Sequence, residues 1–422
     1  MSEQNSDNNS FPVLEQQGSE TIDEDRRSTV EEDGRPQEEG TLDPSFIFTK
    51  WDDLYINPDI IRGIYATGFE NPSPIQSKAI IPLSKGRDII AQAQSGTGKT
   101  AAFTIGSLSR INLADNYCQV LIMSPTHELS RQIADVVRNV SSFLKGIRVK
   151  TILGGSSIDD DVADMRKNPP HVIVGCPGRV YDMIRRRHIN ANRLRLVVLD
   201  EADEMLSSGF KEQVYNIFQN LNKNVQIALF SATLPPNIMQ ITTKFMRDPV
   251  SISVKAESLT LEGIKQYFVA VEDDRQKYMT LKDLYQHITL GQCIIYCNSV
   301  KRVVDLYEAM KEDSFPVVCI HSNMDRTERE RSFSEFRRGD ARVLISSNVT
   351  ARGIDIQQVS IVINFDVPKD VHTYLHRIGR SGRWGRKGTG LNFITRRDIV
   401  KLREIETYYC TQINELPEQF SF

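Results

Sequence analysis

The segment Ala93–Thr100 reads Ala-Gln-Ser-Gly-Thr-Gly-Lys-Thr, which is typical of a loop that wraps around phosphate groups, with alanine where the strict pattern begins with glycine. A short apolar run, Asp88–Ala91, precedes this segment, and a stretch of helical pattern, Ala101–Leu108, follows it. A glycine-rich turn without a ligand is the alternative. The order of strand, loop and helix favours a phosphate-binding loop.

Each residue type in this loop has a chemical role toward a nucleoside triphosphate. Gly96 and Gly98 allow backbone N–H groups to surround the phosphates, and Lys99 brings a positive charge to the β- and γ-phosphate oxygens. The hydroxyl of Thr100 is a ligand for Mg²⁺. The predicted nucleotide-binding residues of the loop are Ser95, Gly96, Thr97, Gly98, Lys99 and Thr100. We therefore expect ATP and Mg²⁺ as cofactors.

Two carboxylates follow a second apolar run. Leu196–Leu199 leads directly into Asp200-Glu201-Ala202-Asp203. An acidic turn after a strand is common by itself, but downstream of a phosphate loop in the same sheet it indicates a hydrolytic centre. In that centre Asp200 would hold Mg²⁺, and Glu201 would orient and deprotonate the attacking water.

A turn upstream of the phosphate loop, Gly68–Gln76, contains two groups suited to adenine. The amide of Gln76 both donates and accepts hydrogen bonds, so it matches N6 and N7 of the base in one plane. The ring of Phe69 can stack on the base. By itself the segment would be an ordinary turn with a buried aromatic residue.

A basic loop near the carboxyl end, His376–Arg383, places four basic side chains around two glycines. A solvated basic loop is the alternative interpretation. A second α/β domain, however, needs positive charge to meet a γ-phosphate held by the first. Arginines supplied across such an interface raise phosphoryl-transfer rates by ~10³–10⁵-fold.

The elements that must position these residues alternate regularly along the chain. Short apolar runs rich in β-branched residues are separated by amphipathic helical stretches, which predicts an α/β fold of two tandem domains, each a parallel sheet with helices on both faces. Ligands bind beyond the carboxyl ends of such strands, where the motifs fall. The expected strands are Asp88–Ala91, Val120–Met123, Val172–Gly175, Leu196–Leu199 and Ile227–Phe230 in the first domain, and Cys293–Tyr296, Val317–Ile320, Val343–Ser346, Ile361–Asn364 and Gly390–Ile394 in the second.

Charge and composition give the domain limits. The net charge is −3, but Met1–Asp43 has thirteen acidic and three basic residues, which leaves +7 for the rest of the chain. This composition predicts a disordered acidic tail over residues 1–43 and a mildly basic body that is compatible with a polyanion. The polar stretch after Arg247 predicts a linker over residues 248–262, between a first domain of residues 44–247 and a second of residues 263–422.

Several protein classes do not fit this sequence. The first twenty residues are polar and acidic, so we expect no secretory signal, and no apolar run is long enough to span a membrane. Of the six cysteines only Cys293 and Cys297 lie close together, and no second pair matches them. This spacing favours reduced thiols in a cytoplasmic or nuclear protein over a zinc site, with the cytoplasm preferred.

Everything after the acidic tail resembles the DEAD-box RNA helicases. The residues Asp200–Asp203 spell the family's name, Ser231–Thr233 matches its coupling motif, and the basic loop matches its last motif. Within the family the chain is most similar to the eukaryotic initiation factor 4A subgroup. That closer similarity lies in Ala91–Thr100, Arg352–Asp355, Val362–Pro368 and His376–Asn392. The resemblance implies two RecA-like domains, RNA-stimulated ATP hydrolysis and local, non-processive strand separation.

The resemblance also implies roles for residues that the pattern alone does not assign. Asp355 would contact the ribose hydroxyls, and Arg380 and Arg383 would meet the γ-phosphate from the second domain. His376, with Ser231–Thr233, would link the nucleotide state to domain closure. The implied RNA contacts are Pro125, Thr126, His127, Gly154, Gly155, Pro177, Gly178, Arg179, Asn298, Arg329 and the loop that begins at Ser347. Contacts of this kind to phosphates indicate sequence-independent binding.

The sequence departs from the family pattern at five positions. They are Trp51 for phenylalanine, His127 for arginine, Cys176 for threonine, Arg326 for glutamine and Asn348 for aspartate. None of these changes touches the ATP chemistry, but several line the implied RNA path. The chain therefore resembles a divergent member of the subgroup.

The expected function is an ATP-dependent RNA helicase that acts on single-stranded or partly structured RNA. An ATP-locked RNA clamp, around which a larger complex assembles, is the alternative within the family, and a DNA motor is the alternative outside it. We expect a monomer that works with protein partners of a translation or ribonucleoprotein complex. Translation initiation, splicing-linked marking and ribosome assembly all remain open as the process.

Overall fold

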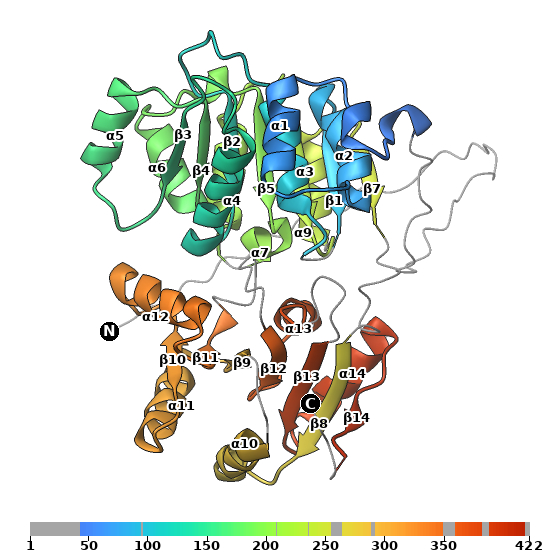
Figure 1. Cartoon of the computed structure of the whole chain (residues 1–422), viewed down its shortest axis with the longest axis vertical. Helices are drawn as coiled ribbons and strands as arrows, with labels where there is room; N and C mark the ends of the chain where they lie inside the picture. Colours follow the sequence, from blue (N-terminus) through green and yellow to red (C-terminus); the bar gives the residue numbers. More distant parts are fainter. Residues whose placement is uncertain are drawn as a thin grey trace, which may run out of the picture. The chain divides into compact units, whose positions relative to one another are not determined.

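The computed structural model describes residues 43–93, 96–207, 209–234, 236–254, 264–287, 292–348, 359–381 and 388–417. Within these ranges the strands form two seven-stranded sheets in which all pairs of neighbours are parallel (Figure 1). The predicted fold class, two tandem RecA-like α/β domains, is therefore confirmed. In the described part of the chain, no helix is both long and apolar enough to cross a membrane.

The first sheet has the strand order β3-β4-β2-β5-β6-β1-β7. Its strands are β1 (Ile89–Gln92), β2 (Val120–Met123), β3 (Val149–Ile152), β4 (Val172–Gly175), β5 (Leu196–Asp200), β6 (Gln226–Ser231) and β7 (Val250–Ser253). Strand β1, which leads into the phosphate loop, lies between β6 and β7. Strand β5, which ends in the acidic turn, pairs with the edge of β6 that faces away from β1.

Helices cover both faces of this sheet because alternate strand residues point to opposite sides. Ile89 and Ala91 pack with the helices of one face, and Ile90 packs with those of the other. The first face carries α1 (Pro58–Ala66), α2 (Pro74–Ser84), α3 (Lys99–Leu108) and α4 (His127–Val140). The second face carries α5 (Ile158–Lys167), α6 (Pro177–Arg185), α7 (Ala202–Ser207), α8 (Lys211–Gln219) and α9 (Pro236–Phe245). Short 3₁₀ turns lie at Pro44–Phe46, Trp51–Asp53 and Ala191–Arg193.

The second sheet repeats this plan with the strand order β10-β11-β9-β12-β13-β8-β14. Its strands are β8 (Ile264–Ala270), β9 (Gln292–Tyr296), β10 (Val317–Ile320), β11 (Val343–Ser346), β12 (Val359–Asn364), β13 (Gly388–Ile394) and β14 (Asn414–Glu415). One face is covered by α10 (Asp274–His287) and α11 (Val300–Glu312), and the other by α12 (Arg326–Arg338), α13 (Val371–Ile378) and α14 (Ile399–Tyr409).

Several helices start a few residues after a strand ends, and the residue just before each of these helices caps its amino end with a side-chain hydrogen bond. The side chain of Thr126 accepts a hydrogen bond from Leu129 N at the start of α4. Ser299 does the same for α11, and Asp370 for α13. Capped starts hold the connecting loops at the carboxyl edge of each sheet, where the predicted site residues lie.

All ten expected strands are present, and four of them have the expected bounds. Strands β3, β7, β8 and β14 were not expected. Strand β7 lies in the stretch that the sequence predicts as a linker, and it pairs with β1 in register from Ile89↔Val250 to Gln92↔Ser253. Its four residues alternate polar and apolar side chains and bury Ile252, so no apolar run marks it. Residues 250–253 therefore belong to the first sheet rather than to a linker.

Candidate functional site

The phosphate loop joins β1 to the amino end of α3. Gly96 and Gly98 have φ values of +85° and +94°, a region that residues with a side chain rarely adopt. Space is short as well, because a Cβ atom on Gly98 would lie 2.5 Å from Nε2 of Gln76. Thr97 lies between the two glycines, and Lys99 and Thr100 begin α3. Of the predicted loop residues, Ser95 lies outside the described part of the chain.

Two buried polar atoms face each other at the start of α3. Nζ of Lys99 lies 3.7 Å from Oε1 of Glu201, which is too far for a good hydrogen bond. Within the part of the chain that the structure describes, neither this Nζ nor the other carboxylate oxygen, Oε2, has a hydrogen-bond partner. Buried polar atoms without partners are costly, so groups in this state commonly await a ligand. A cationic Nζ at a helix amino end fits a phosphate oxygen.

The acidic turn follows β5 directly. Oδ1 of Asp200 accepts a hydrogen bond from the backbone N–H of Glu201, whose φ is +54°. Burial raises the pKa of Asp200 to about 7, and the neighbouring Glu201 carboxylate adds to the shift. Burial acts on Glu201 in the same direction, but nearby basic groups, Lys99 first, outweigh it and hold the pKa of Glu201 below its usual range. A cation held by Asp200 and Thr100 would relieve this crowding of negative charge, so the donor set fits Mg²⁺.

Gln76 lies against the phosphate loop. Its Nε2 donates to the carbonyl oxygen of Gly98 at 3.2 Å, and its Oε1 accepts from Ser73 N at 2.7 Å. The amide therefore ties the start of α2 to the loop. Phe69 is half-buried beside the first helical face. Their contact with adenine stays a prediction.

The coupling motif and the acidic turn are hydrogen-bonded to each other. Oγ1 of Thr233 donates to Oδ2 of Asp203 at 2.7 Å, and Asp203 N donates to Oγ of Ser231 at 3.2 Å. Nε2 of His376 lies 3.3 Å from the same Oδ2. One carboxylate oxygen each of Glu201 and Asp203 and one ring nitrogen of His376 all lie within 4.8 Å of one another. The structure therefore brings together three motifs that are far apart in the sequence.

The basic loop is described in part. Arg380 is buried, and its Nε donates to the carbonyl oxygen of His376 at 3.2 Å. Arg383 and Asp355, to which the resemblance assigns the γ-phosphate and the ribose, lie outside the described residues.

The implied RNA contacts of the first domain lie in loops at the carboxyl edge of its sheet. Pro125 and Thr126 follow β2, and a Cβ on Gly154 would lie 3.4 Å from Nε2 of His127, so these two residues are adjacent. Gly155 has a φ of +83°. The other implied contacts here are Pro177 and Gly178, at the start of α6.

Two arginines predicted to face RNA have partners within the protein. Arg179 donates to the carbonyl oxygen of Ser156 at 2.7 Å and contacts Oδ2 of Asp161 at 3.2 Å. Arg329 contacts Oε1 of Glu128 at 3.2 Å, and its Nη2 also faces carbonyl oxygens of the loop after β10. Both side chains therefore hold loops of the proposed RNA path in place, a role that the sequence does not reveal.

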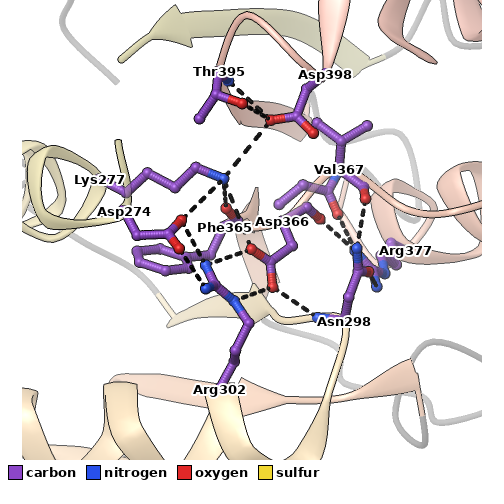
Figure 2. Close-up of polar contacts among 11 residues, drawn as sticks. Asp274, Lys277, Asn298, Arg302, Phe365, Asp366, Val367, Arg377, Thr395 and Asp398 are labelled. Carbon is purple, nitrogen blue, oxygen red and sulfur yellow. Dashed lines mark hydrogen bonds and ion pairs between the residues drawn. The ribbon is translucent and has the colours of Figure 1, made fainter. Parts of the chain in front are cut away.

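A buried polar network in the second domain was also missed. The carboxylate of Asp366, just after β12, is bonded to Arg302 and to the backbone N–H of Asn298 (Figure 2). It lies 2.7 and 2.8 Å from the guanidinium of Arg302 and 2.9 Å from the nitrogen of Asn298. Nζ of Lys277 lies 3.7 Å from the same carboxylate. Arg377, to which the sequence assigns no role, donates to the side chain of Asn298. Asp366 lies just after β12, but Lys277, Arg302 and Arg377 lie within α10, α11 and α13, so no single sequence pattern marks this network.

Known proteins resemble the chain over most of its length. Residues 73–241 match the DEAD/DEAH box helicase family, and residues 276–385 match the helicase conserved C-terminal domain. An ATP-dependent RNA helicase eIF4A of Candida albicans is 50% identical over 368 residues, which cover 87% of this chain and 92% of that protein. A eukaryotic initiation factor 4A of Caenorhabditis elegans is 47% identical over 394 residues, or 93% of this chain and 96% of that protein.

Solved structures agree with the fold. The structure of S. cerevisiae Dbp5 bound to RNA and ADP BeF3 has a TM-score of 0.81 and 35% sequence identity, and it covers 88% of this chain and 96% of that one. Mss116p bound to ssRNA and AMP-PNP has a TM-score of 0.79 at 24% identity, with 89% of this chain and 81% of that chain covered. At that identity the second comparison supports the fold alone.

Proposed function

The chain belongs to the DEAD/DEAH box helicases, and from this premise we propose that it is an ATP-dependent RNA helicase that separates short RNA duplexes during translation initiation. Relatives named initiation factor 4A, which match most of the chain, support the choice of process. We also propose that it acts as a cytoplasmic monomer together with protein partners of the initiation machinery.

The observation that carries the proposal is a pair of buried atoms at the amino end of α3, Nζ of Lys99 and Oε2 of Glu201, to which no described residue offers a hydrogen bond. In the proposed reaction Lys99 offsets the charge of the β- and γ-phosphates. Glu201, whose pKa is held low, stays ionised and can take a proton from the attacking water. Asp200 and Thr100 would hold Mg²⁺, which would neutralise further phosphate charge.

The domain interface completes this site. The proposal gives Arg380 and Arg383 the task of stabilising charge on the equatorial oxygens of the transition state. His376 of the second domain contacts Asp203, which also accepts a hydrogen bond from Thr233 of the coupling motif. We propose that this shared carboxylate couples the position of the second domain to the nucleotide site of the first. Such an arrangement makes hydrolysis depend on the state of both domains.

RNA is proposed to bind across the loops at the carboxyl edges of the two sheets. Backbone N–H groups at the start of α4 and at Gly154–Gly155, with Asn298 and Ser347 in the second domain, face the phosphates rather than the bases. Contacts to phosphates carry no sequence information, so one surface accepts many RNA sequences.

The test compares ATP hydrolysis without nucleic acid, with mixed-sequence single-stranded RNA, and with DNA of the same length. We expect RNA to stimulate multiple-turnover hydrolysis, DNA to have little effect, and ATP to be required for displacement of a short RNA strand. A single burst of product followed by stalled turnover would indicate the clamp instead. Equal stimulation by DNA and RNA would contradict the proposal.

A further inference from the structure

A polar hollow of about 660 Å³, which we call the amino-edge hollow, lies at the amino edge of the first sheet. Its walls come from the segments that precede β2, β5 and β6, which are neighbours in the sheet. Arg110, Arg193 and Arg195 line it together with four asparagines, and its described lining includes no acidic side chain. The phosphate loop and the acidic turn follow the opposite, carboxyl ends of β1 and β5. The amino-edge hollow is therefore separate from the nucleotide site.

Arg110 has little within the protein to offset its positive charge. Its Nη1 lies 3.5 Å from the carbonyl oxygen of Ser84, which is a weak contact, and its buried Nε has no hydrogen-bond partner in the part of the chain that the structure describes. Burial lowers the pKa of Arg110, and the like charge of Arg195 lowers it further. Because an arginine in a protein stays protonated, an anion in the hollow would stabilise this group.

The charges of the other two arginines in the hollow are balanced differently. Nη2 of Arg195 lies 2.8 Å from Oδ2 of Asp115, so an ion pair offsets this charge. The guanidinium carbon of Arg193 lies 5.1 Å from the centre of the Tyr117 ring. Contact with an aromatic face orients a guanidinium but leaves its positive charge in place. Arg193 therefore adds to the positive charge of Arg110.

A fourth arginine lies at the rim of the hollow. Nη1 of Arg247 lies 3.4 Å from Oδ1 of Asn224, and its Nη2 lies 3.2 Å from the carbonyl oxygen of Val225; both partners line the hollow. Four arginines thus gather around one carboxylate, that of Asp115. The carboxyl end of α3 lies beside Arg110 and offsets about half a charge, so an excess of roughly two to three positive charges remains.

The size of this excess favours one class of anion. A phosphate monoester carries about −1.5 to −2 charges at neutral pH, whereas a phosphodiester or a carboxylate carries about −1. The free oxygens of a monoester also match the planar fork of a guanidinium, which binds oxyanions through two parallel N–H bonds. Side-chain amides both donate and accept, so they suit the polar group that bears the phosphate, and the hollow has four of them: Asn112, Asn192, Asn222 and Asn224.

We propose that the amino-edge hollow binds a phosphate monoester between the guanidinium groups of Arg110 and Arg195. Its volume of about 660 Å³ is within the ~300–1,000 Å³ of known ligand pockets, so there is room for more than a phosphate ion. The source of the monoester is a small phosphorylated molecule or a phosphorylated side chain of a partner protein. The inference is independent of the proposed function, because it uses neither the nucleotide site nor the RNA path.

The first test is thermal unfolding of the full chain with Mg²⁺ and a non-hydrolysable ATP analogue, which keeps phosphate probes out of the phosphate loop. O-phosphoserine at about ten times its dissociation constant should raise the midpoint by about 2–5 °C, because it binds the folded chain. Serine and dimethyl phosphate, at the same ionic strength, should leave the midpoint unchanged. A rise with dimethyl phosphate as large as that with O-phosphoserine would overturn the assignment to a monoester.

Arg110→Gln removes one guanidinium group and its repulsion with Arg195. Without a probe, the midpoint of this variant should equal or exceed that of the wild type, and the rise with O-phosphoserine should be lost. Arg166→Gln is the matched control, because it removes the same charge from an exposed position on α5 and should keep the rise. A purely structural role for Arg110 would instead lower the midpoint without a probe and leave the rise unchanged.

Two further probes distinguish the sources of the monoester. A peptide of glycines around one phosphoserine should bind about tenfold tighter than inorganic phosphate where the hollow takes a protein side chain, because the asparagine amides then also hold the peptide backbone. Equal affinities would assign the site to a small phosphorylated molecule. No rise of the wild-type midpoint with any of these monoesters, or a rise that Arg110→Gln retains, overturns the site. Absence of RNA-stimulated hydrolysis would overturn the proposed function and leave this inference standing.

Discussion

Lys99 and Glu201 form a buried pair whose members have different proposed roles. The positive charge of Lys99 attracts phosphate oxygens, whereas the carboxylate of Glu201 is the proposed catalytic base. Because the two groups lie 3.7 Å apart without a hydrogen bond, each is available to the nucleotide and to water. Substitutions at the two positions should therefore have different consequences.

Lys99→Ala should weaken ATP binding, because the counter-charge of the phosphates is removed. Glu201→Gln keeps the shape of the side chain and should bind ATP while hydrolysis falls about 10²-fold or more, the usual contribution of a general base. Binding is measured by titration with a fluorescent ATP analogue, and turnover by phosphate release. Wild-type turnover by Glu201→Gln would show that the catalytic base lies elsewhere.

His127→Arg should tighten RNA binding about 3–10-fold at low salt, because it adds a full positive charge beside Gly154, and the gain should shrink as salt is raised. Asn192→Arg is the control, since it adds the same charge before β5, at the amino edge of the same sheet. RNA affinity is measured by anisotropy over a range of salt concentrations. No change in His127→Arg at low salt would place this residue outside the RNA path.

At the residue scale, side-chain chemistry and spacing pointed to Lys99, Asp200 and Glu201, and the structure places Nζ of Lys99 beside the carboxylate of Glu201, while their roles stay predictions. Chemistry and spacing were insufficient for Arg179 and Arg329, because the carbonyl oxygens that these arginines bind come from loops that only the folded sheets bring near. Arg377 was missed for a related reason, since it donates hydrogen bonds to asparagines at the ends of three different strands, which only the folded sheet brings together.

Helices α1 and α4 approach each other so closely that one position between them requires a glycine. A Cβ on Gly63 of α1 would lie 1.8 Å from the carbonyl oxygen of Val140, the last residue of α4. No side chain fits there without separation of the two helices. The glycine therefore sets how closely these helices pack on the first sheet.

Gly63→Ala should destabilise the first domain by about 2 kcal/mol or more, although alanine is the better helix former by about 1 kcal/mol. Gly178→Ala is the control, because a Cβ on this helical glycine meets nothing within 4 Å. Its stability should equal that of the wild type or rise by up to about 1 kcal/mol, because helix propensity acts there without a clash. Chemical denaturation measures both, and similar stability for the two variants would contradict the close contact.

At the element scale, continuous apolar runs predicted the ten buried strands correctly. Strand β7 was not predicted because Val250–Ser253 alternates polar and apolar residues and contains no apolar run. Its strand conformation is stabilised by pairing with β1. Strand β14 has two residues, too few for any periodic pattern. Edge strands of this kind depend on their neighbour more than on their own sequence.

The extent of the first domain has a consequence for the molecule as a whole. A fragment of residues 44–254 retains β7, whereas one that ends at residue 247 leaves the outer edge of β1 unpaired. We expect the longer fragment to unfold at a temperature at least ~4 °C higher, which corresponds to about 1–2 kcal/mol in a domain of this size. Thermal unfolding of the two fragments measures this difference, and equal midpoints would mean that β7 adds nothing to the sheet.

The longer fragment should bind ATP but hydrolyse almost none, because it lacks His376 and Arg380. We expect less than about 1% of the RNA-stimulated rate of the full chain, within the range that a trans-acting arginine supplies. Phosphate release with saturating RNA is the measurement. Hydrolysis by the fragment at the full-length rate would remove any catalytic role for the second domain.

The position of β1 between β6 and β7 also governs how the protein is made. Strand β1 emerges early from the ribosome, yet both of its partners are the last strands of the first sheet to be synthesised. At ~5–20 residues per second, the roughly 160 residues between β1 and β7 take about 8–32 seconds to appear. Throughout that interval the nascent phosphate loop has no completed sheet beneath it, so the growing chain cannot bind ATP until the first domain is almost fully translated.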